Sequence, residues 1–468
     1  MRKKVRRFTL VQSNRLGEEK IGKLIFMLAV PTVISQLVNM LYNIVDRMYI
    51  GHIPEVGAEA LTGLGLCFPI IMLVSAFSSL FGMGGAPQAA IEMGKGNNKK
   101  AEKILGNCVC ALLSVALVLM VVLFLFGEDL LMLFGASENT IGYALDYLNV
   151  YAFGTIFVQI ALGLNPFITT QGFAKYSMIT VVLGAVLNIV LDPLFIFVFD
   201  MGVSGAATAT IISQAASAIF VLTFLLGKKT TLKIRKENLR IDKKIMLPVV
   251  ALGVSPFVMQ STESILNICF NVSLQKYGGD IAVGTMTIIG SVMQLAYMPM
   301  QGISQGAQPV TSYNYGAGKM DRVKAAIKIQ IIACSVFAVT VWAAVMCFPQ
   351  VFIGIFNKDP ELMSMATWAM RVYAFGIFSL GVQMACQQTF VALGFAKVSL
   401  LLACLRKIIL LIPLIFILPN FMDNKVLAVF LAEPVADILA AATTFTVFMV
   451  MARKHLTTPQ SKDKGVTL

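Results

Sequence analysis

The tetrapeptide YAFG at residues 151–154 occurs again at 373–376, and GFAK at 172–175 occurs again at 394–397. Both pairs are separated by the same 222 positions (373 − 151 and 394 − 172). The same interval relates a set of turn and helix-packing residues, in which Gly84, Pro87, Gly94 and Gly96 return as Gly306, Pro309, Gly316 and Gly318. A constant interval indicates a duplicated chain. In an apolar chain, duplication predicts a pseudo-symmetric membrane protein whose site lies between the halves or within one of them.

The composition places the chain in the membrane. Apolar residues make up 57% of the 468 positions, charged residues make up only 13%, and the mean hydropathy is +0.81. A soluble protein is nearer half apolar and a quarter charged. Apolar runs of about 20 residues, the length that crosses a bilayer as a helix, recur along the whole chain. We therefore predict an all-α polytopic membrane protein.

Twelve spans are predicted, six in each half. They cover residues 24–50, 61–93, 104–126, 143–170, 177–199 and 203–226, and then 245–274, 281–312, 327–348, 362–393, 398–418 and 427–451. The basic segment 228–244 is the predicted cytoplasmic linker between an N-terminal lobe (1–227) and a C-terminal lobe (245–468, with a cytoplasmic tail). Because each lobe has an even number of spans, the repeats are expected to be parallel, with a cleft between two six-helix bundles.

The net charge of +13 is distributed unevenly between the two sides of this topology. Lysine and arginine gather at residues 2–7, 95–103, 228–244, 319–328 and 453–454. The opposite loops carry mainly acids, namely Glu55, Glu59, Glu128, Asp129, Asp359 and Asp423. This bias predicts that both termini are cytoplasmic. It also explains the basic clusters without nucleic-acid binding.

Several classes of function lack their motifs here. The nearest string to a phosphate-binding loop, at residues 227–230, has no upstream glycine, so ATP hydrolysis is not expected. The only histidines, His52 and His455, lie outside the predicted membrane core, and the cysteines show no disulfide or zinc pattern. Neither an enzyme nor a cofactor is expected, and the energy for any uphill transport would have to come from an ion gradient or an outside partner. The oligomeric state cannot be read from the sequence.

Polar residues inside the spans are costly and therefore informative. The first span carries a stripe on one helical face, formed by Gln36, Asn39, Asn43 and Asp46. The seventh span carries the corresponding stripe of Gln260, Glu263 and Asn267. Duplication of the stripe predicts that both copies face inward. Amides in such stripes also serve as hydrogen-bonding residues between packed helices, which is the alternative interpretation.

A second polar pair lies in the fifth span, where Asn188 and Asp192 are one turn apart and precede Pro193. Such a pair can share a proton or a hard cation, and the proline can free a nearby carbonyl. Counting residues along the helices places Asp46, Asp192 and Thr210 in the outer half of the first lobe. Alternatively, Asp46 pairs with Arg47 or lipid headgroups, and Asp192 caps a broken helix.

Two cations lie inside the eleventh span. Arg406 and Lys407 are expected to neutralise Glu433 or Asp437 of the twelfth span rather than to bind a ligand.

Several of these segments together resemble one family. They are residues 31–51 with NIVDRMYIG, residues 82–107 with the GKG turn, QGFAK, LNIVLDPLFIF and GVSGAATATIISQ. Over almost its whole length the chain resembles the multidrug and toxic compound extrusion (MATE) transporters, nearest the bacterial DinF-like and MepA-like branch. The resemblance implies two six-helix lobes in a bacterial plasma membrane, alternating access, and export of amphipathic organic cations in antiport with Na⁺ or H⁺.

The resemblance also implies a coupling site inside the N-terminal lobe. Its acid in the first helix is matched by Asp46, its Asn and Asp in the fifth by Asn188 and Asp192, and its Thr in the sixth by Thr210. Na⁺ or a proton would bind there. Another branch uses acids in the seventh and tenth helices. In this chain the expected place of the seventh-helix acid is near Gln260, and Glu263 lies about one turn beyond it. Gln383 occupies the position of the tenth-helix acid.

Three other functions were weighed against a cation exporter. A flippase of a lipid-linked precursor shares the architecture but would be expected to have extra helices or a wide cationic cleft. A membrane-embedded enzyme or receptor would need catalytic motifs that are missing. A channel would explain the intramembrane carboxylates less directly. The coupling ion and the natural substrate cannot be read from the sequence.

Overall fold

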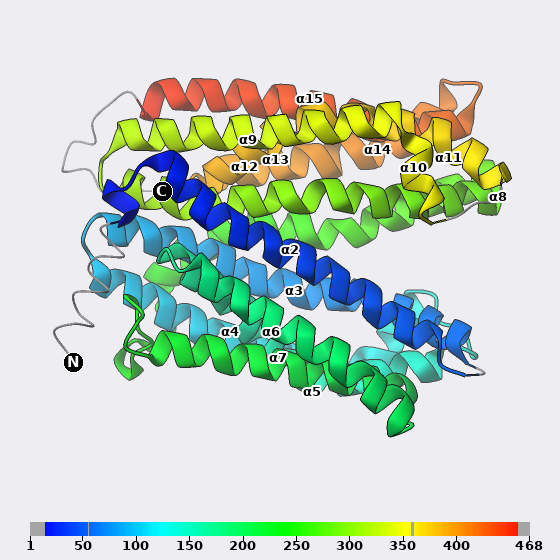
Figure 1. Cartoon of the computed structure of the whole chain (residues 1–468), viewed down its shortest axis with the longest axis horizontal. Helices are drawn as coiled ribbons and strands as arrows, with labels where there is room; N and C mark the ends of the chain where they lie inside the picture. Colours follow the sequence, from blue (N-terminus) through cyan, green and yellow to red (C-terminus); the bar gives the residue numbers. More distant parts are fainter. Residues whose placement is uncertain (1–14, 55, 357–359, 457–468) are drawn as a thin grey trace.

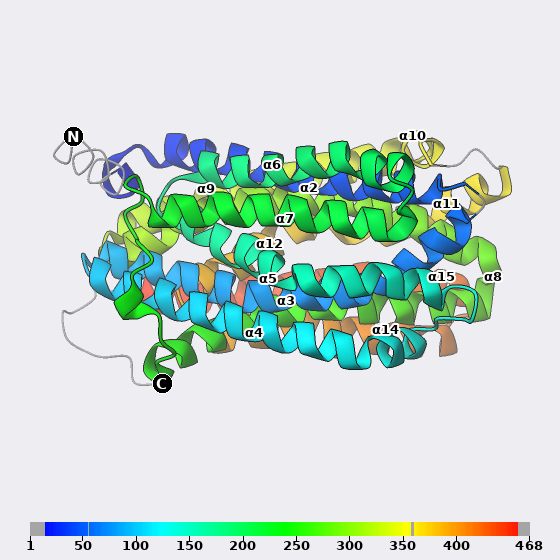
Figure 2. The same ribbon diagram turned by 90° about the horizontal axis from the view of Figure 1, so that it is seen from below.

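The protein is described by a computed structural model of the whole chain, in which residues 15–54, 56–356 and 360–456 are placed well enough to describe. The predicted basic segment 2–7 and the loop acids Glu55 and Asp359 lie outside the described residues. Long helices make up the fold, and in both views they run along one common axis (Figures 1 and 2).

The first half of the chain contains six long helices. They are α2 (Ile21–Gly51), α3 (Gly57–Gly94), α4 (Asn98–Leu133), α5 (Ile141–Thr170), α6 (Ala174–Pro193) and α7 (Gly202–Leu226). A π-helical segment, η1 (Leu194–Val198), extends α6 directly after Pro193. A connection with a short 3₁₀ turn, η2 (Lys236–Asn238), leads to the second half.

The second half begins with α8 (Lys243–Gly316), which contains two predicted spans. Its backbone leaves the helical region at Gly279, where φ is +64°, a conformation that glycine adopts without strain. The remaining elements are α9 (Met320–Cys347), α10 (Pro349–Gly354), α11 (Pro360–Tyr373), η3 (Ala374–Gly376), α12 (Ile377–Ala392), α13 (Ala396–Cys404), η4 (Leu405–Leu411), α14 (Ile412–Ile417), η5 (Leu418–Asn420) and α15 (Lys425–His455).

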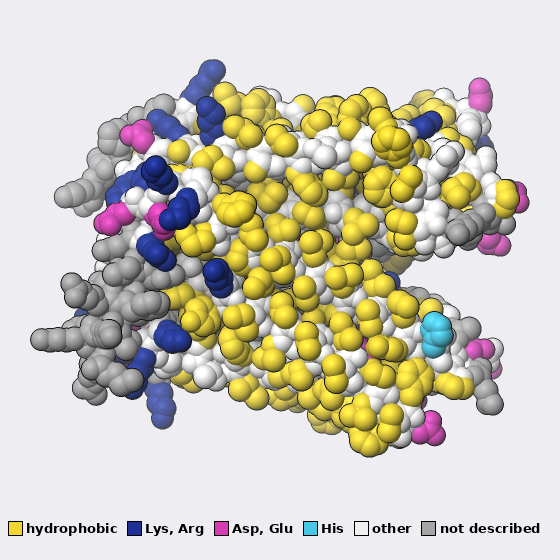
Figure 3. All heavy atoms as spheres, viewed as in Figure 1, with side chains coloured by type: hydrophobic (Ala, Val, Ile, Leu, Met, Phe, Trp, Pro, Cys, Tyr) yellow, Lys and Arg dark blue, Asp and Glu magenta, His cyan; other side chains and the backbone are white. Residues whose placement is uncertain are grey.

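In the described part of the chain, eleven helical stretches are long and apolar enough to cross a membrane. One of them is the 74-residue α8, which the break at Gly279 divides into two, so the described helices account for the twelve predicted spans. Lys and Arg side chains gather at the end of the molecule where α2 begins and α15 ends, and acidic side chains gather at the opposite end (Figure 3). We refer to these as the basic end and the acidic end.

The two halves form two lobes that touch at the basic end and part toward the acidic end. At the basic end, one hydrophobic core combines Leu24 and Leu28 of α2 with Ala307 and Val310 of α8. Toward the acidic end each lobe has a core of its own, one around Ile50 and Leu148 and the other around Phe270 and Phe430. The surface is hollowed between the lobes at that end (Figure 3), and we call this opening the cleft.

Glycines allow the lobes to approach closely at the basic end. A Cβ atom on Gly84 of α3 would overlap the Val249 carbonyl oxygen of α8, and one on Gly253 of α8 would overlap the Leu80 carbonyl oxygen. The duplicated pair behaves in the same way, since Gly94 faces the Tyr313 backbone and Gly316 faces the Ile91 backbone. Backbones that pack this closely exclude any larger residue. The repeat that the sequence shows is therefore used to seal the basic end.

Substitution of Gly253 by alanine should open this seal, because the added methyl group collides with backbone that cannot move alone. The measurement is the distance between spin labels on Asn98→Cys and Asp321→Cys, which are exposed residues at the basic ends of α4 and α9, in a cysteine-free background. We expect the distance distribution to shift to longer values. Gly290→Ala, also in α8 but with open space around its Cβ position, is the control and should leave the distribution unchanged. An unshifted distribution in Gly253→Ala would contradict the close-packed seal.

Candidate ion and substrate sites

Asp46 lies in the outer part of α2 and is buried, with 7% of its surface exposed. One of its carboxylate oxygens, Oδ1, is buried without a hydrogen-bond partner. The neighbouring Arg47 points elsewhere, with its guanidinium 4.9 Å from the centre of the Phe68 ring. An acceptor left unpaired in the interior is costly, so it indicates a place where a proton or a cation can bind.

Asn188 connects α6 to α7. Its amide Nδ2 donates to Asp192 Oδ1 at 3.0 Å and to Thr210 Oγ1 at 3.4 Å. Asp192 is fully buried, one turn after Asn188 and immediately before Pro193. The structure therefore brings together three of the four residues predicted for the coupling site. The fourth residue, Asp46, lies on α2, which packs directly against α6, the helix that carries Asn188 and Asp192.

Three oxygen atoms of the four predicted residues are buried without partners: Asp46 Oδ1, Asn188 Oδ1 and Asp192 Oδ2. Oxygen acceptors of this kind suit a proton or a hard monovalent cation. We call Asp46, Asn188, Asp192 and Thr210 the N-lobe oxygen site. Among the described residues no group of three or more His, Cys, Asp or Glu side chains could hold a metal ion.

A cavity of about 40 Å³ reaches two members of this site, Asn188 and Thr210. It is lined from α2, α5, α6 and α7, and a space of this size holds a few water molecules rather than a drug-sized molecule. The polar lining includes Asn165, Ser213, Gln214 and Ser217, which the sequence analysis missed. The signal that could have revealed the last three is their spacing from Thr210, which places all of them on one face of α7.

The inner parts of the two polar stripes join the lobes. Gln36 Nε2 donates to Gln305 Oε1 at 3.0 Å, and Ser79 Oγ donates to Gln260 Oε1 at 2.8 Å. These contacts lie about 23 Å from the start of α2 and about 26 Å from the start of α8. Gln36 and Gln260 therefore serve as contacts between helices of different lobes, which is the alternative interpretation given above.

Asn43, Glu263 and Asn267, in the outer parts of the stripes, face the cleft, whereas Asn39 and Asp46 turn into the N-terminal lobe. Asn43 lies two turns beyond Gln36 on the same face, and its Nδ2 donates to the Asn39 carbonyl at 2.6 Å. Asn39 itself lines the small cavity. Glu263 and Asn267 continue the face of Gln260, and Asn43, Glu263 and Asn267 are all exposed. Because Gln36 and Gln260 point to the opposite lobe, these residues point into the space where the lobes part.

The charged residues of the C-terminal lobe are paired differently from the prediction. Arg406 contacts both Asp437 and Glu433, as expected, with nitrogen–oxygen distances of 2.7 and 3.0 Å. Lys407, however, forms its ion pair with Glu263 of α8 rather than with an acid of α15. The prediction for Lys407 is therefore wrong. The reason is that adjacent helical residues point about 100° apart, so Arg406 and Lys407 reach different helices.

A family model described as MatE matches residues 31–194 and again residues 256–417, one match in each half of the chain. The chain is 25% identical over 425 residues to the multidrug export protein MepA of Staphylococcus haemolyticus, covering 90% of this chain and 93% of that protein. It is 24% identical over 398 residues to MepA of Staphylococcus aureus strain MSSA476, covering 85% and 87%.

The fold is similar to a solved structure of the MATE multidrug transporter DinF-BH in complex with R6G. The TM-score is 0.88 and the sequence identity 34%, over 96% of this chain and 99% of that chain. The fold is also similar to that of a MOP superfamily transporter from Pyrococcus furiosus, with a TM-score of 0.88 over 95% of this chain and 98% of that chain. At 22% sequence identity this likeness concerns the fold and not the function.

Proposed function

Because the chain belongs to the MatE family, we propose that it is a secondary active transporter that exports amphipathic organic cations in exchange for Na⁺ or H⁺. Two observations support multidrug export: the MepA relatives bear that name, and the transporter DinF-BH aligns with almost the whole chain at 34% identity. The carboxylate of Glu263 and the amides of Asn43 and Asn267, which are exposed at the cleft, favour a positively charged substrate.

The observation that carries the ion-coupling part is the set of unpaired oxygen atoms in the N-lobe oxygen site. The coupling ion binds between Asp46 and Asp192, with Asn188 and Thr210 supplying neutral oxygen atoms. Binding of one positive charge relieves the repulsion between the two carboxylates and satisfies acceptors that are otherwise unpaired. Since α6 continues as the π-helical η1 after Pro193, one residue beyond Asp192, a change at this carboxylate alters the packing of α6 on α2 and α7.

The direction of transport depends on the side of the membrane to which the cleft opens. The lobes are sealed at the basic end and parted at the acidic end, so the cleft communicates with the acidic side. The positive-inside rule supports a cytoplasmic basic end, so we infer that this is the outward-open state and that both termini are inside the cell. We assign the lobes to residues 1–227 and 245–468, with 228–244 as the linker. The ion enters from outside and favours the release of the bound substrate.

The exposed residues Asn43, Glu263 and Asn267 are assigned to substrate contact, Asn39 to the small cavity beside them, and Gln36 and Gln260 to the lobe contact beneath them. A flippase for a pyrophosphate-linked lipid would need cations that face the cleft. Both cations of the eleventh span are instead buried and paired, with side-chain exposures of 8% for Arg406 and 4% for Lys407.

The function is tested with purified protein in proteoliposomes. Efflux of ethidium is followed under an imposed pH gradient, an imposed Na⁺ gradient, or neither. We expect either the pH gradient or the Na⁺ gradient to drive ethidium transport against the ethidium concentration gradient. Ethidium flux that depends on neither ion gradient would indicate a channel or uniporter. Translocation of a lipid-linked precursor without ethidium flux would indicate a flippase.

Thr210→Val tests the role of the hydroxyl group in ion binding. The change keeps the shape but removes one oxygen atom, so the ion concentration that gives the half-maximal rate should rise about two- to tenfold, corresponding to about 0.5–1.5 kcal/mol. Thr208→Val, two residues earlier in α7, is the control, because its hydroxyl donates to the Ser204 carbonyl at 2.7 Å. Equal ion dependence of the two variants would remove Thr210 from the site.

A further inference from the structure

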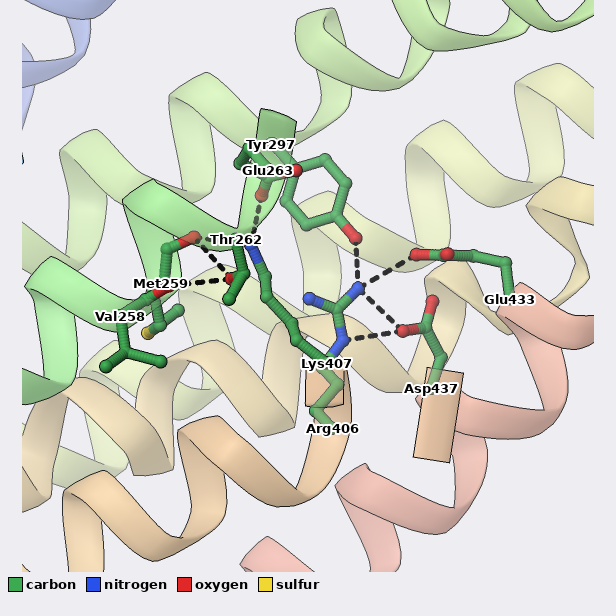
Figure 4. Close-up of polar contacts among 9 residues, drawn as sticks. All are labelled: Val258, Met259, Thr262, Glu263, Tyr297, Arg406, Lys407, Glu433 and Asp437. Carbon is green, nitrogen blue, oxygen red and sulfur yellow. Dashed lines mark hydrogen bonds and ion pairs between the residues drawn. The ribbon is translucent and has the colours of Figure 1, made fainter. Parts of the chain in front are cut away.

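A cluster of ionisable side chains lies inside the C-terminal lobe, outside the N-lobe oxygen site (Figure 4). Its members come from α8, η4 and α15, and they are Glu263, Tyr297, Arg406, Lys407, Glu433 and Asp437. We call it the C-lobe charge cluster. Three carboxylates meet two cationic groups, so one negative charge is left without a partner when all five groups are ionised.

The cluster divides into two parts. In the first part, Arg406 Nε donates a hydrogen bond to Asp437 Oδ1 at 2.8 Å. Its Nη2 donates to Glu433 Oε1 at 3.0 Å and to the Tyr297 hydroxyl at 2.6 Å. All three charged side chains are at least nine-tenths buried. Two carboxylates and one guanidinium leave this part with a surplus negative charge. A buried surplus of this kind is costly in a membrane, so a further cation nearby stabilises it.

In the second part, Lys407 pairs with Glu263, and its ammonium also donates to the Met259 carbonyl at 2.7 Å. The two partners differ sharply in exposure, since the Lys407 side chain is 4% exposed and the Glu263 side chain is 57% exposed. The apolar residues that α8 exposes near this level, Ile265, Ile268 and Val272, lie on another face of the helix. Glu263 is thus open to the cleft, while its cation lies behind it.

Figure 4 shows the Lys407 side chain lying beside Arg406, with Glu263 on one side of the two cations and Glu433 and Asp437 on the other. Lys407 therefore stands between an exposed carboxylate in the cleft and a buried group with a surplus negative charge. It follows Arg406 in the π-helical segment η4, and π-bulges occur often at functional sites because they loosen the regular backbone ladder.

We propose that Lys407 is a tethered cation that occupies Glu263 until the cationic group of a substrate replaces it. When an organic cation binds to Glu263, Lys407 turns toward Glu433 and Asp437 and balances their surplus charge. The occupied cluster is then neutral as a whole. Lys407 thereby sets the affinity for substrate, because every cation that binds Glu263 must displace it. This proposal rests on the proposed function, since it assigns a docking group to the same cationic cargo.

The test is equilibrium binding of tetraphenylphosphonium to purified protein in detergent, without any ion gradient. Lys407→Gln removes the competitor, so the Kd should fall about tenfold, equivalent to about 1.4 kcal/mol. Glu263→Gln should raise the Kd about tenfold. The double variant should match Glu263→Gln, because Lys407 acts only through that carboxylate. Lys425→Gln, an exposed lysine of the same lobe, should behave like the wild type.

The outcomes separate the two proposals. If wild-type protein does not bind tetraphenylphosphonium at all, the cationic cargo is wrong and the proposed function falls with it. If the wild type binds but Lys407→Gln binds equally or more weakly, the tethered-cation proposal is overturned and the proposed function stands. Should Lys407→Gln not give monodisperse protein, Glu263→Gln decides, since an unchanged Kd in that variant overturns the proposal equally.

Discussion

Replacing Asp46 by asparagine should abolish ion-driven efflux while leaving the protein inserted and folded. The change removes the negative charge at a position that is 7% exposed but keeps nearly the same shape. Loss of one partner from a buried charge pair costs about 2–5 kcal/mol, which weakens ion binding at least about thirtyfold. Efflux of ethidium from proteoliposomes under the driving gradient should therefore fall to the level of vesicles without protein.

The matched control is Asp146→Asn, which removes an acid from α5 at an exposed position. Its transport rate should equal that of the wild type. The two variants must show the same elution profile and the same thermal unfolding in detergent, so that a loss of transport cannot be assigned to misfolding. If Asp46→Asn transports at the wild-type rate under the same gradient, Asp46 has no part in coupling.

The second large effect is expected for Arg406→Met, and it concerns stability. The variant leaves Glu433 and Asp437 buried without their cation, and breaking a buried ion pair on one side costs about 3–5 kcal/mol. The midpoint of thermal unfolding in detergent should drop clearly. Arg371→Met is the control, because Arg371 is exposed and its Nε donates to the Met346 carbonyl at 3.2 Å. That variant should unfold close to the wild-type temperature.

A compensated variant separates the charge effect from the loss of packing. Replacing Glu433 by Gln and Asp437 by Asn together with Arg406→Met removes the stranded charges, so most of the lost stability should return. If Arg406→Met is as stable as Arg371→Met, these carboxylates do not depend on the guanidinium. If the compensated variant is no better than Arg406→Met, the loss comes from packing instead.

The duplicated fold could be predicted because repeats at a constant interval and apolar runs of spanning length are both properties of the sequence. The breaks within the spans could not. The segment YAFG is regular helix at 151–154, within α5, but its copy contains the 3₁₀ turn η3. A Cβ on Gly376 would lie 3.0 Å from the Asp437 Cβ, so α15 packs directly on this turn. That contact joins residues 61 positions apart (437 − 376), and no local pattern reveals it.

The candidate sites also contain some contacts that the sequence predicts and others that it does not. Asn188 and Asp192 are one turn apart in one helix, so their hydrogen bond follows from spacing alone. The pairing of Lys407 with Glu263 joins residues 144 positions apart. It depends on the face of η4 from which Lys407 projects, which differs from the face of Arg406. Sequence reasoning chose the acids of α15 for both cations because it had no measure of that direction. Gln305, the partner of Gln36, was missed although Gln301, Gln305 and Gln308 recur at helical spacing in the same span, and that stripe is the signal that could have revealed it.

The central claim is that ion and substrate move in opposite directions through one coupled cycle, and reciprocity tests it most directly. Proteoliposomes are prepared with equal Na⁺ and equal pH on both sides and a steep ethidium gradient, and internal pH and Na⁺ dyes report ion movement. We predict that ethidium leaving the vesicles drives H⁺ or Na⁺ inward against its own rising gradient, and that Asp46→Asn and Asp192→Asn abolish this movement. Ethidium flux with no counter-movement of either ion, or undiminished counter-movement in both variants, would contradict the account.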